Sequence, residues 1–124
     1  MPTSDARKLI QTTLVGEALD AAPVAIFVAD DDRRYIAVNE YACLLLGYTR
    51  NELLALGVLD VAVNPDARAD YDEMLASGFS TGTARLRRKG GEEIEVAYRA
   101  SETTVGTMRV FVSVCWPAAD SPAR

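Results

Sequence analysis

The first twenty residues carry apolar side chains at helical spacing. Ile10, Leu14 and Ala18 recur every four residues, and with the neighbouring Leu9, Val15 and Leu19 they form an apolar stripe along a helix. Pro23 ends this helix, because proline disfavours helical backbone in the residue that precedes it. The pattern predicts an N-terminal amphipathic helix, taken as residues 1–21, whose apolar stripe must be buried against another surface.

Five apolar or alternating runs of strand length surround a helical middle. They are Val24 to Asp30, Tyr35 to Val38, and three later runs at about 81–88, 93–101 and 107–116. The polar residues 30–34 form the turn of a hairpin between the first two runs. Gly90 and Gly91 turn the third run into the fourth, and residues 103–106 join the fourth to the fifth. Two strands, several helices and three strands predict an α+β domain.

Capping residues mark the first helices of the middle segment. Asn39 is placed to cap a helix that ends at Gly47. Thr49 and Glu52 have the spacing of a capping box, which begins a second short helix. Residues 57–63 fit a strand by their apolar pattern alone.

A longer helix is predicted after Asn64, which is expected to be its N-cap. Pro65 then occupies the first turn, where its missing amide hydrogen costs nothing. The helix is expected to stop at Ser77 and Gly78, because glycine adopts the backbone conformation that ends helices.

Size and charge limit the classes of protein that fit. The chain has 124 residues, 49% of them apolar, which suits one soluble domain. No window reaches the ~18 uninterrupted apolar residues of a spanning helix, and polar residues 11–13 interrupt any signal-peptide core, so a cytoplasmic location is expected. A net charge of −5 argues against nucleic acid as a partner and against membrane insertion. Basic residues 85–89 suit an anion-binding patch or, as we prefer, a solvated strand face.

Candidate catalytic and metal-binding residues are scarce. The chain contains no histidine, so the commonest general base and the usual nitrogen ligand of zinc are absent. It has neither a phosphate-binding loop nor a nucleophile elbow. The acidic residues 30–32 are interpreted as a solvated turn, and Cys43 and Cys115 as reduced thiols. We therefore expect no enzyme activity and no metal site.

Several of these features, taken together, resemble the PAS domain family. They are Asn39, the Gly47-Tyr48 pair, the Glu52-Leu53 pair, and the strand Val24 to Ala29 followed by Asp30. Their order and spacing match the family over roughly residues 22–116.

The resemblance implies a fold and a domain organisation. The five strands would form one antiparallel sheet in the order 2-1-5-4-3, with helices on its concave face and the N-terminal helix on its outer face. The PAS domain would span residues 22–117, followed by a disordered tail at 118–124. Residues 57–63 become a loop or a single helical turn instead of a strand.

The same resemblance excludes two cofactors. The light-sensing LOV branch attaches a flavin to a cysteine after the second short helix, where this chain has Asp60 or a neighbour of it, with neither cysteine nearby. Val58, Leu59 and Val61 offer no partner to the polar edge of a non-covalently bound flavin ring. A histidine-ligated haem is impossible without histidine. We expect that no cofactor is required.

The end of the chain departs from the family. Signalling members commonly finish their last strand with Asp-Ile-Thr, whereas this chain has Cys115, Trp116 and Pro117. No effector domain is expected within the 124 residues. The chain is therefore either a stand-alone sensor that acts through its own dimer or a partner protein, or a piece of a longer protein.

The side chains that point from the sheet toward the helices determine whether this space is a filled core or a ligand pocket. By periodicity alone Val112 and Val114 would point inward, but the PAS register turns Phe111 and Ser113 toward the helices. Many side chains on that face are small, which fits either closely packed helices or a bound ligand. We expect a small hydrophobic or amphipathic ligand, specifically a fatty-acid-like one; the alternative is a ligand-free interaction or dimerisation module. The predicted ligand-binding residues are Phe27, Ala29, Asn39, Tyr48, Tyr71, Met74, Leu75, Ala84, Leu86, Val96, Tyr98, Ala100, Phe111 and Ser113.

The outer face would then carry a continuous apolar patch. Soluble monomers rarely expose one of this size. The N-terminal helix is expected to cover the patch, within one protomer or between two, and the resemblance implies a homodimer. The predicted interface residues are Ile10, Leu14, Val15, Leu19, Ile26, Val28, Val110, Val112, Val114 and Trp116.

Overall fold

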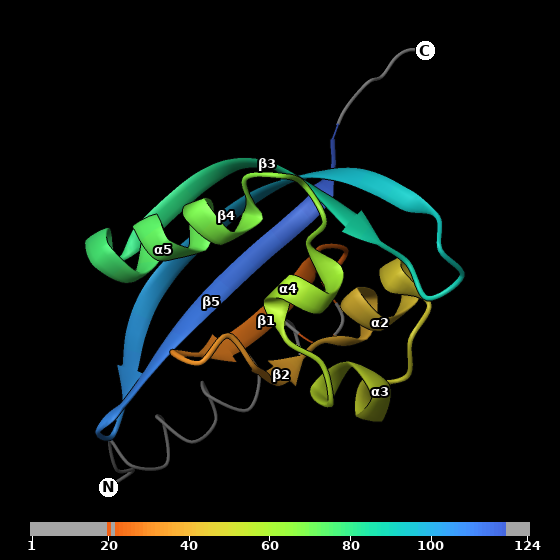
Figure 1. Ribbon diagram of the computed structural model, residues 1–124. Coiled ribbons are helices and arrows are strands. Elements are labelled where there is room, and N and C mark those ends of the chain that lie inside the picture. The colour runs from red at the N-terminus through yellow and green to blue at the C-terminus, as the bar shows by residue number, and fades with distance from the viewer. Residues whose placement is uncertain (1–19, 21, 119–124) are drawn as a thin grey trace, which may run out of the picture.

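The computed structural model describes Asp20 and residues 22–118, and this part of the chain forms a five-stranded antiparallel sheet with helices on one side (Figure 1). The strands are β1 (Ala25–Asp30), β2 (Tyr35–Val38), β3 (Phe79–Arg87), β4 (Glu93–Val105) and β5 (Met108–Pro117), and the helices are α2 (Glu40–Leu46), α3 (Arg50–Leu54), α4 (Val58–Val61) and α5 (Ala67–Ser77). The strand order β2-β1-β5-β4-β3 confirms the predicted fold. No helix in the described ranges has the length and apolar character needed to cross a membrane.

Two predicted segments fall at the ends of the chain. The predicted N-terminal helix lies outside the described residues except for Asp20, and the predicted tail lies outside them except for Ala118. The apolar stripe of residues 1–21 therefore stays a sequence prediction.

Asn39 joins β1, β2 and α2. Its Oδ1 accepts hydrogen bonds from the backbone N–H of Ala42 (3.0 Å) and of Ile26 (2.9 Å), and its Nδ2 donates to the carbonyl of Val24 (2.9 Å). The side chain is 5% exposed. One buried amide therefore caps α2, as predicted, and also holds the start of β1 against it.

The next two helices follow their capping residues. The capping box of α3 is present, with Glu52 N–H donating to Thr49 Oγ1 (3.1 Å) and Thr49 N–H donating to Glu52 Oε1 (2.9 Å). Residues 57–63 contain the single turn of α4 and not a strand, as the resemblance implied. At Gly57 the chain passes so close to the hairpin that an added Cβ would lie 2.7 Å from the carbonyl oxygen of Arg33. Only glycine fits this approach without a shift of the backbone.

Three predicted boundaries are wrong. Helix α5 begins at Ala67 with Asp66 as its N-cap, so Asn64 is not the cap; its Oδ1 instead accepts from Arg85 N–H (3.3 Å). Strand β3 begins two residues earlier than predicted. Strand β4 continues through the predicted connection at 103–106, because the β-branched residues there pair with β5 as far as Val105 opposite Met108. Gly106, at φ 63°, lies in the turn that closes this longer hairpin.

The register of the two central strands separates the faces of the sheet. Phe27 pairs with Ser113 and Ala29 with Phe111, and these side chains point toward the helices. The intervening pair of Val28 and Val112 therefore belongs to the outer face. The expectation from periodicity alone, with the valines of β5 inside, is wrong. The largest fully buried side chains include Leu46, Leu53, Val61, Val96 and Phe111.

Candidate functional site

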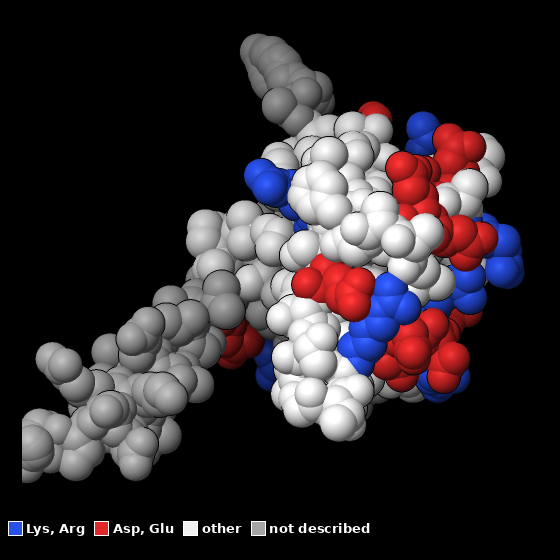
Figure 2. All heavy atoms as spheres, turned by 90° about the vertical axis from the view of Figure 1, so that its left-hand side faces the viewer, with Lys and Arg blue, Asp and Glu red and all other residues white. Residues whose placement is uncertain are grey.

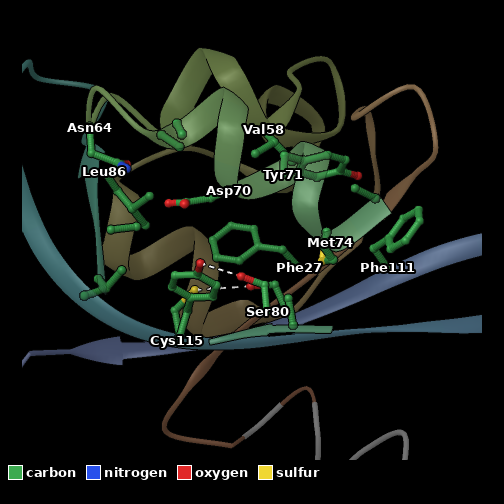
Figure 3. Close-up of a pocket in the computed structure, with 18 of the residues that line it drawn as sticks. Phe27, Val58, Asn64, Asp70, Tyr71, Met74, Ser80, Leu86, Phe111 and Cys115 are labelled. Carbon is green, nitrogen blue, oxygen red and sulfur yellow. Dashed lines mark hydrogen bonds between the residues drawn. The ribbon is translucent and has the colours of Figure 1, made fainter. Parts of the chain in front are cut away.

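A cavity lies between the concave face of the sheet and helices α4 and α5 (Figure 3). Helix α5 contributes Ala67, Asp70, Tyr71 and Met74, whose spacing of three and four residues places them on one face of the helix. The sheet contributes residues of one face from β1, β3, β4 and β5, since side chains of one strand alternate between its faces, and Tyr35 from β2. The floor and walls from the sheet are Phe27, Ala29, Tyr35, Ser80, Ala84, Leu86, Val96, Tyr98, Ala100, Phe111, Ser113 and Cys115.

The cavity is small and almost entirely apolar. It has a volume of about 100 Å³ and adjoins an outer groove of about 390 Å³ between α5 and the beginning of β3. Asp70, Ser80 and Tyr98 line both spaces. An apolar cavity of roughly 150 Å³ is known to hold a benzene molecule, so the inner space suits a small ring or a short alkyl chain.

Most polar side chains of the cavity have partners within the protein. The hydroxyls of Ser80 and Tyr98 are hydrogen-bonded at 2.8 Å, and Tyr71 OH donates to the carbonyl of Asp30 at 3.0 Å. Ser113 Oγ lies 3.7 Å from Cys115 Sγ. These contacts fix the walls, but they leave few free donors or acceptors for a ligand.

Tyr35 and Asp70 are the exceptions. Tyr35 is only 7% exposed, yet its hydroxyl makes no hydrogen bond to any residue in the described part of the chain. The carboxylate of Asp70 has no hydrogen bond or ion pair there either, and Figure 3 shows it pointing from α5 into the space above the sheet. Buried hydroxyl and carboxyl groups usually find partners. These two groups are therefore available to a ligand.

Burial governs the protonation states around the cavity. It raises the pKa of Cys115 to about 11 and the pKa of Tyr71 to about 12, with the guanidinium of Arg33 opposing the shift at Tyr71. Partial desolvation, together with Asp66 and Glu73, raises the pKa of Asp70 above its usual range. Burial also raises the pKa of Tyr35. Near neutral pH the thiol and phenols are neutral, so the cavity presents no activated nucleophile.

Most of the predicted ligand-binding residues come together at this cavity. Those that line it are Phe27, Ala29, Tyr71, Met74, Ala84, Leu86, Val96, Tyr98, Ala100, Phe111 and Ser113. Asn39, Tyr48 and Leu75 do not line it: Asn39 caps α2, and the other two pack partly buried against the hydrophobic core. These three residues are therefore not part of the cavity wall, because their side chains make contacts that hold the fold together.

The sequence prediction missed several residues of the wall. They are Tyr35, Val58, Ala62, Asn64, Ala67, Asp70, Ser80 and Cys115. Asp70 was detectable, because it lies three residues after Ala67 and four before Met74 on one helical face. Tyr35 gave no such indication, since its inward orientation depends on the irregular pairing of β1 with β2 between Val28 and Ala29.

The described members of the predicted interface lie on the outer face of the sheet. Ile26 and Val110 are buried, Val28, Val112 and Val114 are half-buried, and Trp116 is 36% exposed. Ile10, Leu14, Val15 and Leu19 lie outside the described residues. The apolar character of this face is thus present in the structure, and what covers it stays a prediction.

The basic run at the turn between β3 and β4 is paired with carboxylates. Arg87 lies 3.5 Å from Glu93, Arg88 lies 3.7 Å from Glu92, and Lys89 lies 2.7 Å from Glu52. This arrangement fits the solvated strand face that we preferred over an anion-binding patch.

A comparison with protein-family models identifies the family. A PAS domain model matches residues 23–115. An uncharacterised protein of Sinorhizobium fredii is 38% identical over 65 residues, which is 52% of this chain and 8% of that protein, so this chain spans a small fraction of its relative.

Solved structures agree on the fold. The PAS domain of a two-component sensor histidine kinase has a TM-score of 0.80 at 20% identity, covering 90% of this chain and 99% of that one. The PAS domain of an HTR-like protein from Haloarcula marismortui has a TM-score of 0.77 at 21% identity, covering 92% and 98%. An RNA-binding light-oxygen-voltage receptor has a TM-score of 0.78 at 22% identity, covering 94% of this chain and 36% of that one.

Proposed function

This chain belongs to the PAS domain family, and from that premise we propose that it senses a small hydrophobic or amphipathic molecule bound between the sheet and α5. PAS domains typically act as sensory modules of signalling proteins and are generally not catalysts. The observation that carries the proposal is the apolar cavity with the unpartnered hydroxyl of Tyr35 in its wall. A ligand with an apolar body would fill the space, and its polar atoms would have the hydroxyl of Tyr35 and the polar residues at the mouth as partners.

The residues of the cavity would bind this ligand mainly by contact. Phe27, Phe111 and Met74 supply large apolar surfaces, while Ala29 and Ala100 leave the space open. The ligand would need no metal, flavin or haem as a cofactor. The fatty-acid-like ligand predicted from the sequence is one member of this class.

Calorimetric titration of the full chain with hexanol and with hexanoate tests the proposal. Ala100 is 5% exposed and lines the cavity, so Ala100→Leu should fill the space, keep or raise the melting temperature, and abolish binding. Ala37→Leu makes the same change at an exposed position of β2 and should bind like the wild type. Equal binding by both variants would place the ligand elsewhere on the protein.

The apolar outer face supports a second function, dimerisation. Val112, Val114 and Trp116 leave apolar surface partly exposed on the outer face of β5. Burial of such surface favours association, because it removes apolar area from water. We infer that the N-terminal stripe and this face meet in a homodimer, through which the ligand state would pass to a partner protein.

Light scattering of the full chain tests the dimer. Leu14→Asp places a charge in the apolar stripe and should lower the measured mass from dimer to monomer at dilutions where the wild type stays paired. Thr13→Asp introduces the same charge on the opposite side of the predicted helix and serves as the control. An unchanged mass for Leu14→Asp would remove the N-terminal segment from the interface.

A further inference from the structure

The mouth of the cavity is acidic, and this feature bears on the charge of the ligand. The outer groove, which adjoins the cavity at Asp70, is lined by Asp70, Glu73, Phe79, Ser80, Thr81, Gly82, Thr83 and Tyr98. We propose that the ligand is a small amphipathic amine, whose apolar part lies in the inner cavity and whose protonated nitrogen lies at the mouth between Asp70 and Glu73. The inference rests on the ligand-binding function proposed above, and it replaces the carboxylate head group of the fatty-acid-like ligand expected from the sequence with an ammonium group.

Asp70 is the main argument for a cation. It lies on α5 and its carboxylate is directed toward an otherwise apolar space (Figure 3). No hydrogen bond or ion pair to this carboxylate occurs among the residues that the structure describes. Asp70 is partly desolvated, and an ammonium group at the mouth would make a charge-assisted hydrogen bond with its carboxylate. A carboxylate head group would add repulsion at the same place.

The surrounding charges point the same way. Within the described ranges, no lysine or arginine lines either the cavity or the groove. Two nearby cations have carboxylates of their own, since Arg33 pairs with Asp72 at 2.7 Å and Arg109 with Glu102 at 2.9 Å. A third, Arg99, lies over the ring of Phe79 at the edge of the groove. Figure 2 shows acidic and basic side chains interspersed on the side on which the helices lie. The preference for a cation therefore rests on the lining of the groove itself, which among the described residues has two carboxylates and no lysine or arginine.

The polar groups of the wall complete the site. The hydrogen-bonded hydroxyls of Ser80 and Tyr98 lie where the cavity meets the groove, so they can accept from an ammonium group held by Asp70. Tyr35, more than nine-tenths buried and without a hydrogen-bond partner among the described residues, lines the inner cavity and not the groove, and it independently indicates that a ligand enters the cavity.

Titration of the full chain with three hexyl compounds of different head group tests the inference. Hexylamine should bind about tenfold more tightly than hexanol, and hexanoate more weakly than hexanol, which corresponds to about 1.4 kcal/mol for the first step. Asp70→Asn has nearly the same shape without the charge, and it should reduce the advantage of hexylamine to about twofold while leaving hexanol unchanged. Glu92→Gln removes a charge at the opposite end of β3 and should keep the full preference.

The outcomes separate this inference from the proposed function. If hexanol binds but hexylamine gains nothing over it, or if Asp70→Asn leaves the preference intact, the amine assignment is wrong while the cavity remains a ligand site. A preference that Glu92→Gln abolishes equally would reduce the effect to net charge and also overturn the assignment. If none of the three compounds binds to the wild type, both proposals fail.

Discussion

Replacement of Asn39 by alanine should destabilise the domain far more than loss of an ordinary helix cap. The side chain satisfies two backbone N–H groups, of Ala42 and Ile26, and donates to the carbonyl of Val24. Loss of the cap itself costs about 1 kcal/mol. Each further backbone group left without a partner in a buried site costs about 1 kcal/mol or more. We expect Asn39→Ala to lower the free energy of unfolding by about 3 kcal/mol, a large fraction of the 5–15 kcal/mol typical of a domain.

Urea unfolding followed by far-ultraviolet circular dichroism measures this loss. The dependence of the free energy of unfolding on urea concentration should be the same for the wild type and the variant, so that the shift in midpoint reports stability alone. Thr49→Ala is the matched control, because Thr49 caps α3 at an exposed position and should cost only about 1 kcal/mol. Asn39→Asp keeps the acceptor but sets a carboxylate against the carbonyl of Val24, so it should be destabilised near neutral pH. Equal losses for Asn39→Ala and Thr49→Ala would refute the idea that the buried bonds to β1 matter.

Three further predictions follow from individual contacts. Gly57→Ala should destabilise the domain by about 1–3 kcal/mol, since its Cβ would meet the Arg33 carbonyl, whereas Gly90→Ala, with open space around it, should be nearly neutral in the same urea assay. The pKa of Asp70 is raised in the folded protein, so at pH values just above 3.8 the folded state binds more protons than the unfolded state. The free energy of unfolding therefore falls as the pH rises through that window. Asp70→Asn should therefore melt above the wild type at about pH 7 and lose this advantage at about pH 3; no difference at either pH would contradict it. Burial and a pKa of about 11 should make Cys115 react with iodoacetamide at about pH 8 far more slowly in the folded than in the unfolded protein, as peptide mass spectrometry would show.

Local features of the sequence predicted much of the fold. Asn39, Gly47 and the Thr49–Glu52 pair cap helices through contacts with residues only a few positions away. The ends of these helices can therefore be predicted from the sequence. The end of β4 was missed because residues 103–106 contain turn formers, yet their β-branched side chains extend the pairing with β5. Tertiary pairing thus overrides a local turn preference at this position.

The candidate site was less predictable than the fold. The inward-facing residues of β1 and β5 required the strand register, and sequence periodicity alone gave the opposite face. The unpartnered states of Tyr35 and Asp70 depend on what surrounds them in space, and no spacing in the sequence reports that. Asn39 was predicted to bind the ligand, but its side chain is hydrogen-bonded to the backbone of Ile26 and Val24 and does not line the cavity.

The mass of the purified full chain, measured by mass spectrometry under native and then denaturing conditions, tests the central claim most directly. The account predicts that the native spectrum shows an excess mass, from a bound ligand, that disappears on denaturation. The excess should be absent from Ala100→Leu and present in Ala37→Leu. A native mass equal to that of the bare chain, with no rise in melting temperature on addition of hexanol, hexanoate or hexylamine, would contradict it and favour a PAS domain that works only through protein contacts.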